Sequence, residues 1–313
     1  MIPVSSPSTF IEPRDVDYAD FPASTLVSEG MQVLYADLKP EHGTAILGVE
    51  YARKDGLPLH LQILLPPMDR ESTAVFPLVV FVQGSAWFEQ DLGQSLPPLA
   101  HFARRGYVVA IVEYRPSPVA PFPAQIRDTG TAIRFLRRKA SDFHIDPNRI
   151  VLWGDSSGGH TTVLTCLTDG DPFFSDEPVD EEPLNIRCFI DYYGPTDISR
   201  MNEEPSIQNH IEPESPEGML IGGANVLDHP NLVAPTVAMN HISPTPRRRP
   251  LLIVHGNKDR LVPFGQSVLL HDALRNAGQP VTFFQLKGAD HGGPSFWKEE
   301  ILSIVDHFIR VNI

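Results

Sequence analysis

The sequence predicts an open α/β fold with a mostly parallel sheet, and two observations support this prediction. First, several short runs are apolar at every position, as expected of strands that helices cover on both faces. These runs are Leu78–Val82, Val108–Val112, Ile150–Trp153, Cys188–Ile190 and Leu251–Val254. Second, amphipathic helical patterns alternate with these runs, which is typical of repeated βα units.

The remaining elements follow from local periodicity. The clearest helix is predicted near residues 126–143, where Ile126, Ile133 and Leu136 recur on one face. Further helices are expected at 95–105, 157–168, 264–277 and 295–310. One more strand is expected at 281–286, and two alternating stretches, 46–53 and 58–65, predict an antiparallel pair at the front of the sheet.

The chain is predicted to form a single domain over residues 1–313, because α/β folds often reach this length as one unit. The proline-rich residues 1–44 are expected to be an irregular N-terminal extension. A second irregular stretch, of about 55 residues, precedes Leu251 and is far longer than the usual 2–6 residues. Since α/β proteins place lids at the carboxyl ends of strands, residues 195–249 are predicted to be a lid, with one short helix beginning after Ser215.

Charge and cysteine content exclude several classes of protein. The chain holds 25 basic and 39 acidic residues, a net charge of −14, and residues 171–220 contribute −11 of it. This balance argues against binding to nucleic acid and to an anionic membrane. The two cysteines, Cys166 and Cys188, form neither a disulfide framework nor a metal-binding spacing. No metal and no cofactor is expected.

The ends of the chain bear on location. The first residues lack the basic and apolar regions of a signal peptide, and no apolar run is long enough to cross a bilayer. We expect a cytoplasmic protein, although a leader that had been removed would leave the same sequence. Its expected partner is a small-molecule substrate, and homo-oligomerisation is left open.

A G-x-S-x-G motif follows the predicted strand Ile150–Trp153 and precedes a predicted helix. The motif is Gly154-Asp155-Ser156-Ser157-Gly158. In this strand–turn–helix context it places a serine on a sharp turn above the sheet, and the turn needs small residues on either side. Ser156 is therefore the candidate nucleophile; the alternative is a glycine–serine turn that only caps a helix.

A serine hydroxyl needs a base and the base needs a carboxylate. In this architecture the acid follows the serine and the base comes last. His291, in a glycine-rich loop before the final helix, is the candidate base; His160, His255 and His307 are interpreted as structural, with His307 packed on the apolar face of the last helix. The candidate acid is Asp259, which follows a strand end. Asp197 is the second candidate, and Asp290 is less favoured because it adjoins the base in sequence.

Acyl transfer also needs donors for the developing oxyanion. The strand Leu78–Val82 ends in Gln83-Gly84-Ser85-Ala86-Trp87, where small residues let backbone N–H groups approach a ligand. The N–H groups of Ser85, Ala86 and Ser157 are the candidate donors.

These pieces, in this order, resemble the α/β-hydrolase fold, and specifically the bifunctional feruloyl and acetyl-xylan esterase group and the esterases related to hormone-sensitive lipase. The resemblance covers residues 45–313. It implies that Ser156 is the nucleophile, Asp259 the acid and His291 the base, with the oxyanion donors named above. The chain departs from the family pattern at Gln83, where the family loop begins with histidine.

The predicted function is that of a serine carboxylesterase acting on short-chain or aromatic acyl esters, with acetyl or feruloyl esters of plant carbohydrate as candidates. Five aromatic residues flank the site loops and are candidates for its substrate pocket: Trp87, Phe88, Tyr193, Phe296 and Trp297. Two alternatives remain: an amidase-type hydrolase, such as an aryl-formamidase or small peptidase, and an inactive hydrolase-like binding module. The acids of residues 171–220 predict either a negative potential at the site or a solvated outer face.

Overall fold

The computed structural model describes residues 10–69, 71–179, 182–243 and 249–313. The chain divides into two units, Met1–Lys39 and Pro40–Ile313. In the first unit the described residues are exposed to solvent and contain a single short 3-10 helix, η1 (Tyr18–Asp20). The first nine residues of the predicted extension lie outside the described residues.

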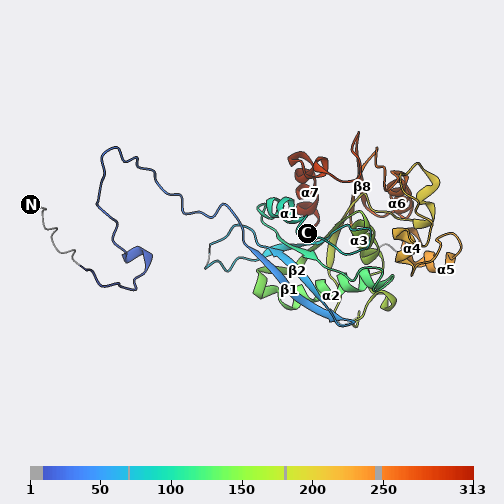
Figure 1. Ribbon diagram of the computed structural model, residues 1–313, viewed down its shortest axis with the longest axis horizontal. Helices are drawn as coiled ribbons and strands as arrows, with labels where there is room; N and C mark the ends of the chain where they lie inside the picture. The colour runs from blue at the N-terminus through green and yellow to red at the C-terminus, as the bar shows by residue number, and fades with distance from the viewer. Residues whose placement is uncertain (1–9, 70, 180–181, 244–248) are drawn as a thin grey trace, which may run out of the picture. The chain divides into compact units, whose positions relative to one another are not determined.

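Eight strands in the second unit form one sheet (Figure 1) in the order β1-β2-β4-β3-β5-β6-β7-β8. Strands β1, β2 and β4 pair antiparallel, and all other neighbours are parallel. The strands are β1 (Ala45–Lys54), β2 (Leu57–Leu64), β3 (Phe76–Val82), β4 (Val108–Val112), β5 (Ile145–Asp155), β6 (Ile186–Tyr192), β7 (Leu251–Gly256) and β8 (Val281–Leu286). Each includes most or all of a predicted run, so the predicted α/β class and its antiparallel front are confirmed.

Helices cover both faces of the sheet, which explains why the central strands are apolar at every position. Helices α1 and α7 pack on one face, and α2, α3 and α6 on the other (Figure 1). Their bounds are α1 (Leu96–Ala103), α2 (Ala124–Arg138), α3 (Ser157–Leu167), α6 (Gly265–Asn276) and α7 (Glu299–Asn312). Three 3-10 helices accompany them: η2 (Ala140–Phe143), η3 (Pro172–Phe174) and η7 (Pro294–Trp297).

The last helix differs from its prediction in two ways. The predicted segment 295–310 divides into η7 and α7, because Lys298 between them is extended (φ −68°, ψ 148°). The buried face of α7 consists of Ile301, Leu302, Val305 and Ile309. His307 lies off this face and is exposed, so the prediction that it packs on the apolar face is wrong.

Residues 195–249 separate β6 from β7, and we call them the insertion; residues 244–248 of it lie outside the described residues. Its elements are η4 (Ile198–Glu203), α4 (Pro216–Leu220), α5 (Pro230–Val233), η5 (Ala234–Thr236) and η6 (Ala238–His241). The predicted helix after Ser215 is confirmed as α4, and the Ser215 hydroxyl accepts the Gly218 N–H at 3.0 Å as its N-cap. The insertion has its own apolar cluster, formed by Trp87, Ile198, Leu220, Ile221, Val226, Val233 and Val237.

Candidate active site

Ser156 stands on a strained turn between β5 and α3. Its backbone has φ 53° and ψ −127°, outside the regions that L-residues favour. The two glycines of the motif allow this turn by close approach: a Cβ on Gly154 would lie 2.2 Å from the Gly158 carbonyl oxygen, and one on Gly158 would lie 1.9 Å from that of Val82. The G-x-S-x-G spacing is thus a steric requirement, as the sequence predicted.

Ser156, His291 and Asp259 lie in one hydrogen-bonded line. His291 Nε2 is 2.9 Å from Ser156 Oγ, and His291 Nδ1 is 2.7 Å from Asp259 Oδ2. The three residues follow β5, β8 and β7, whose carboxyl ends meet at one edge of the sheet because the strands are parallel. The imidazole is 15% exposed and the carboxylate is fully buried.

The Asp259 carboxylate is held ionised despite its burial. Burial opposes ionisation, but the hydrogen bonds with His255 and His291 outweigh it and lower the pKa of Asp259 to about 2. The second carboxylate oxygen, Oδ1, accepts the N–H groups of Leu261 and Val262, each at 2.9 Å. A buried carboxylate with this many donors keeps one orientation, which suits the partner of an imidazole base.

His255 is a contact of the acid that the sequence did not reveal. Its Nε2 lies 3.1 Å from Asp259 Oδ2 and 3.0 Å from the Val262 carbonyl oxygen. Both of these oxygens only accept, so Nε2 carries the proton and donates it. Nδ1 then accepts the hydroxyl hydrogen of Ser267 at 2.8 Å. The sequence predicts only a structural role for His255, because no local pattern indicates that it shares an oxygen with His291.

The two other candidate acids are engaged elsewhere. Asp290 accepts from the side chain of Arg260 at 2.7 Å, and this guanidinium lowers the pKa of Asp290. Asp197 caps η4 by accepting the Ser199 N–H at 3.1 Å and its hydroxyl at 2.6 Å. Asp290 Oδ1 also accepts the His291 backbone N–H at 2.8 Å, but neither Asp290 nor Asp197 makes a hydrogen bond to the His291 imidazole in the described part of the chain.

The candidate oxyanion loop follows β3 and is folded back on α3. The Ser85 N–H donates to Ser157 Oγ at 2.9 Å. Ala86 has φ 56°, and its N–H donates to no group in the described part of the chain. Ser157 is the first residue of α3, where backbone N–H groups have no partner within the helix. Ala86 and Ser157 therefore present free donors, whereas the Ser85 donor must leave Ser157 before it can bind an oxyanion.

Tyr114 forms hydrogen bonds with two residues of this loop. Its hydroxyl lies 3.0 Å from Ser85 Oγ and 3.2 Å from the Gln83 carbonyl oxygen. Its backbone N–H donates to the Gln90 side chain at 2.9 Å. Burial raises the pKa of Tyr114 to about 12, so the phenol stays protonated and able to donate.

Asp155 connects the loop to the opposite side of the site. One carboxylate oxygen accepts the Gly84 N–H at 2.8 Å, and the other accepts the Tyr193 hydroxyl at 3.2 Å. Burial raises the pKa of Asp155, against these hydrogen bonds. The ring of Tyr193 packs edge-on against that of His291, with centroids 4.8 Å apart. Asp155, the residue before Ser156, thus contacts the candidate oxyanion loop directly and His291 through Tyr193.

The predicted pocket aromatics occupy different environments. Phe296 is fully buried and packs against Tyr193, at 4.5 Å between centroids. Trp87 is 2% exposed and packs in the apolar cluster of the insertion. Trp297 is half-buried and packs against Trp153 at the edge of the core, and Phe88 is also half-buried. In this conformation Phe88 and Trp297 are the two of the five that are not buried, and their contact with substrate remains a prediction.

His160 links the helix after the nucleophile to the insertion. Its Nε2 lies 2.9 Å from the Thr236 carbonyl oxygen and so carries the proton. Its ring packs edge-on against Trp87, with centroids 5.1 Å apart. Burial lowers the pKa of His160 to about 4, which keeps it neutral at neutral pH. These contacts fasten the insertion over the amino-terminal end of α3.

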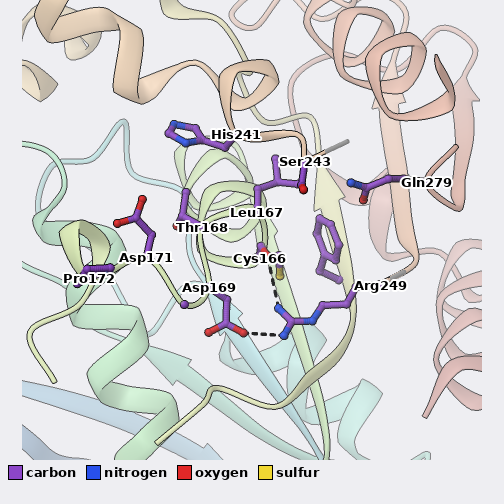
Figure 2. A pocket seen from close by; sticks show the side chains of 12 residues that line it. Cys166, Leu167, Thr168, Asp169, Asp171, Pro172, His241, Ser243, Arg249 and Gln279 are labelled. Atoms are coloured by element: carbon purple, nitrogen blue, oxygen red, sulfur yellow. Dashed lines mark hydrogen bonds and ion pairs between the residues drawn. The ribbon is translucent and has the colours of Figure 1, made fainter. Parts of the chain in front are cut away.

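A cavity of about 610 Å³, some of whose lining side chains are labelled in Figure 2, borders the last turn of α3. Cys166 and Leu167 in its wall belong to the last turn of α3, whereas Ser156 precedes the first. The helix spans roughly 16 Å at 1.5 Å per residue, so this cavity is separate from the surroundings of Ser156. Among the residues described, no cluster of histidine, cysteine and acidic side chains could hold a metal ion. No helix in the described ranges is both long and apolar enough to cross a membrane.

The fold and the arrangement of Ser156, His291 and Asp259 define a protein of the α/β-hydrolase class. The chain belongs to the BD-FAE family, whose model matches residues 61–274. The resemblance stated from the sequence is therefore confirmed.

Similar proteins include esterases of known sequence and structure. The probable carboxylic ester hydrolase LipM of Mycobacterium tuberculosis is 27% identical over 252 residues, which cover 77% of this chain and 54% of LipM. A carbohydrate esterase from gut microbiota superposes with a TM-score of 0.75 at 27% identity, covering 88% of this chain and 99% of that one. The bifunctional GH43-CE protein of Bacteroides eggerthii superposes with a TM-score of 0.74 at 27% identity, and the match covers 86% of this chain and 38% of that protein. The chain spans about half the length of the curated relatives it matches.

Proposed function

We propose that this protein is a serine carboxylesterase that works through an acyl-enzyme on Ser156. The observation that carries the proposal is the hydrogen-bonded line from Ser156 Oγ through His291 to Asp259. A serine hydroxyl in this arrangement can lose its proton to the imidazole as it attacks a carbonyl carbon. The family membership and the esterase names of the relatives support the same reaction.

In the proposed first step, Ser156 Oγ attacks the ester carbonyl while His291 Nε2 takes the hydroxyl proton. Asp259 holds Nδ1–H and stabilises the imidazolium that forms. The negative charge on the carbonyl oxygen is stabilised by backbone N–H groups, with Ala86 and Ser157 as the free donors and Ser85 as a third. The imidazolium then protonates the departing alcohol oxygen, and the carbon–oxygen ester bond breaks.

In the second step, water takes the place of the alcohol. His291 removes a proton from water, whose oxygen attacks the acyl carbon of the Ser156 ester. The tetrahedral intermediate collapses, the carboxylic acid leaves and Ser156 recovers its proton from His291. Only residues of this chain and water take part.

We further propose that residues 1–313 form one hydrolase domain, with residues 1–44 as an irregular extension and 195–249 as a lid. The insertion packs around Trp87, next to the oxyanion loop, which supports the lid assignment. A lid here would shape the part of the site that receives the alcohol or acyl group.

The proposed substrates are short-chain or aromatic acyl esters, including acetyl or feruloyl esters of plant carbohydrate. The printed descriptions of the two superposed proteins, a carbohydrate esterase and a bifunctional GH43-CE, support the carbohydrate class. Trp87 and Phe296 are buried in their clusters, which leaves little apolar surface for a long chain. Acyl chains of about two to four carbons are therefore expected to give the highest kcat/KM.

A panel of nitrophenyl esters graded by acyl length, with acetylated xylan, methyl ferulate and N-formyl-kynurenine, tests the proposal. Ser156→Ala should lower kcat by about 10³-fold or more with little change in stability, since the members of a triad act as a unit. Faster turnover of N-formyl-kynurenine than of every ester would favour the amidase alternative. Failure of a fluorophosphonate probe to label Ser156 would favour the other alternative, an inactive hydrolase-like binding module.

A further inference from the structure

A second serine–histidine–carboxylate line lies within the insertion, apart from the proposed catalytic residues. His210 Nδ1 is 2.8 Å from Glu217 Oε1, and His210 Nε2 is 2.9 Å from Ser206 Oγ. His210 and Glu217 are only 2% and 3% exposed. We call Ser206, His210 and Glu217 the latch. A buried histidine–carboxylate pair is weak evidence for a contribution to stability. We therefore infer the role of the latch from its hydrogen-bond partners.

The latch ends on the turn that carries the catalytic acid. Ser206 Oγ lies 3.1 Å from the carbonyl oxygens of both Arg260 and Leu261, and the Ile207 N–H donates to the Arg260 carbonyl at 2.9 Å. Arg260 and Leu261 directly follow Asp259. The Leu261 N–H also donates to Asp259 Oδ1. The insertion therefore hydrogen-bonds to the carbonyl oxygens of this turn, and an N–H group of the same turn orients Asp259.

The direction of the hydrogen bonds distinguishes the latch from a second nucleophilic site. A carbonyl oxygen only accepts, so the Ser206 hydroxyl donates its hydrogen to the turn. His210 Nε2 must then be the donor to Ser206 Oγ. In a catalytic pair the imidazole accepts the serine proton, which is the opposite direction. Ser206 is thus held as a link between the imidazole and the backbone.

The turn borders open space where the latch holds it. A cavity of about 620 Å³ borders the turn and is lined by Ser206, Asp259, Arg260 and Phe264, among others. Along the cavity wall, no closely packed neighbours among the described residues fix the turn. A hydrogen-bonded tether can supply the fixation that packing does not.

We propose that the latch positions Asp259 for catalysis by fixing the Asp259–Leu261 turn, an inference that rests on the proposed esterase function. Ser206, His210 and Glu217 are positioning residues, because they act on the acid through the backbone and touch no reacting atom. Displacing a catalytic group by about 1 Å can cost on the order of 10²-fold in rate. Loss of one tether is expected to cost less, about tenfold in kcat.

The test compares Ser206→Ala with Ser206→Thr and with a matched control, Ser199→Ala. Ser199 lies in the same insertion and also loses a hydroxyl hydrogen bond, but to Asp197 and not to the acid turn. We expect Ser206→Ala to lower kcat about tenfold for nitrophenyl acetate, with KM and the melting temperature nearly unchanged. Ser206→Thr, which keeps the hydroxyl beside the cavity, should restore kcat, and Ser199→Ala should match the wild type.

A second variant keeps the proposal testable if Ser206→Ala folds poorly. His210→Asn leaves the Ser206 hydroxyl and its Gln208 N–H donor in place but removes the imidazole donor, and should also lower kcat at unchanged KM. The rate of fluorophosphonate labelling of Ser156, expressed per folded molecule, should fall in parallel. Wild-type kcat and labelling rate in both variants, or a loss of melting temperature alone, would overturn the proposal.

The proposed function fails in a different way. If the wild type hydrolyses no ester and Ser156 is not labelled, the esterase proposal is wrong, whatever the latch variants show. If the wild type is labelled at Ser156 and only the latch variants leave its rate unchanged, the latch proposal alone is wrong.

Discussion

His255 and His291 donate to the same oxygen of Asp259, Oδ2, at 3.1 and 2.7 Å. One of these imidazoles is the proposed base, and the other is fully buried behind the acid. A carboxylate oxygen held by a buried donor cannot rotate away when its exposed partner moves. The position of Asp259 therefore depends on a residue outside the proposed triad.

His255→Phe, which keeps a ring but has no nitrogen, should weaken both the site and the fold. The variant loses the donor to Asp259 and leaves the Ser267 hydroxyl without its acceptor, which typically costs about 1–3 kcal/mol of stability. We expect kcat to fall about tenfold as Asp259 gains freedom. Urea unfolding and steady-state kinetics measure the two effects. Ser267→Ala, which keeps the Nε2 donor, should have the smaller effect on kcat; equal losses would contradict this account.

Asp259→Asn should abolish most activity, by about 10³–10⁴-fold, because an amide cannot stabilise the imidazolium and favours the wrong tautomer. Asp197→Asn should keep kcat within about twofold, since Asp197 caps η4 through Ser199. Steady-state rates on one nitrophenyl ester decide between them. The reverse pattern would transfer the role of the acid to Asp197.

Asp191 predicts a pH dependence of stability. Burial raises the pKa of Asp191 to about 7, against the hydrogen bond from the Gly194 N–H. The folded protein therefore holds a proton that the unfolded chain releases near pH 4, and stability is lost as pH rises from about 4 to about 7. Asp191→Asn removes this dependence.

The variant should gain stability relative to the wild type across that interval, on the order of 4 kcal/mol for a shift of about three pKa units. Urea unfolding at several pH values between 4 and 8 measures the difference in the free energy of unfolding between the variant and the wild type. The prediction concerns the change of this difference with pH, since the substitution can also add a difference that does not depend on pH. Wild-type and variant curves that run parallel would show that Asp191 is ionised throughout.

The acidic segment predicts discrimination against charged esters. The structure divides this segment: Asp176 pairs with Lys54 at 2.6 Å and Glu177 with Arg134 at 3.2 Å, so the first half faces basic side chains of β1 and α2. In the insertion, Glu203 pairs with Arg200 and Glu217 with His210, so Glu204, Glu212 and Glu214 remain as the main source of a negative potential. An ester with a free carboxylate should then be a poorer substrate than its neutral analogue.

Monomethyl and dimethyl succinate provide the comparison. We expect a kcat/KM about fivefold lower for the charged ester, as for a repulsion of about 1 kcal/mol. The ratio should approach one as salt shortens the reach of the field to roughly 8 Å or less. A ratio near one at low salt, or one that salt does not change, would leave these acids with a role in solubility alone.

The sequence by itself determined the class of fold and the three residues of the proposed triad. Buried parallel strands must be apolar on both faces, so the runs at β3 to β7 were visible without any structure. The turn at Ser156 excludes side chains at Gly154 and Gly158. Its motif can therefore be recognised from a short stretch of sequence. Asp259 and His291 could be chosen because chain order in this architecture is fixed.

Only the tertiary structure decided how these residues are supported. His255 meets Asp259, Tyr114 meets Ser85, and Ser206 meets the Arg260 carbonyl. The last two contacts join residues distant in the chain, through elements whose relative placement no local pattern encodes. The same holds for Trp87, predicted at the pocket but buried in the insertion cluster. Periodicity reports which face of an element is buried, whereas hydrogen-bond partners depend on which elements become neighbours when the sheet and the insertion pack.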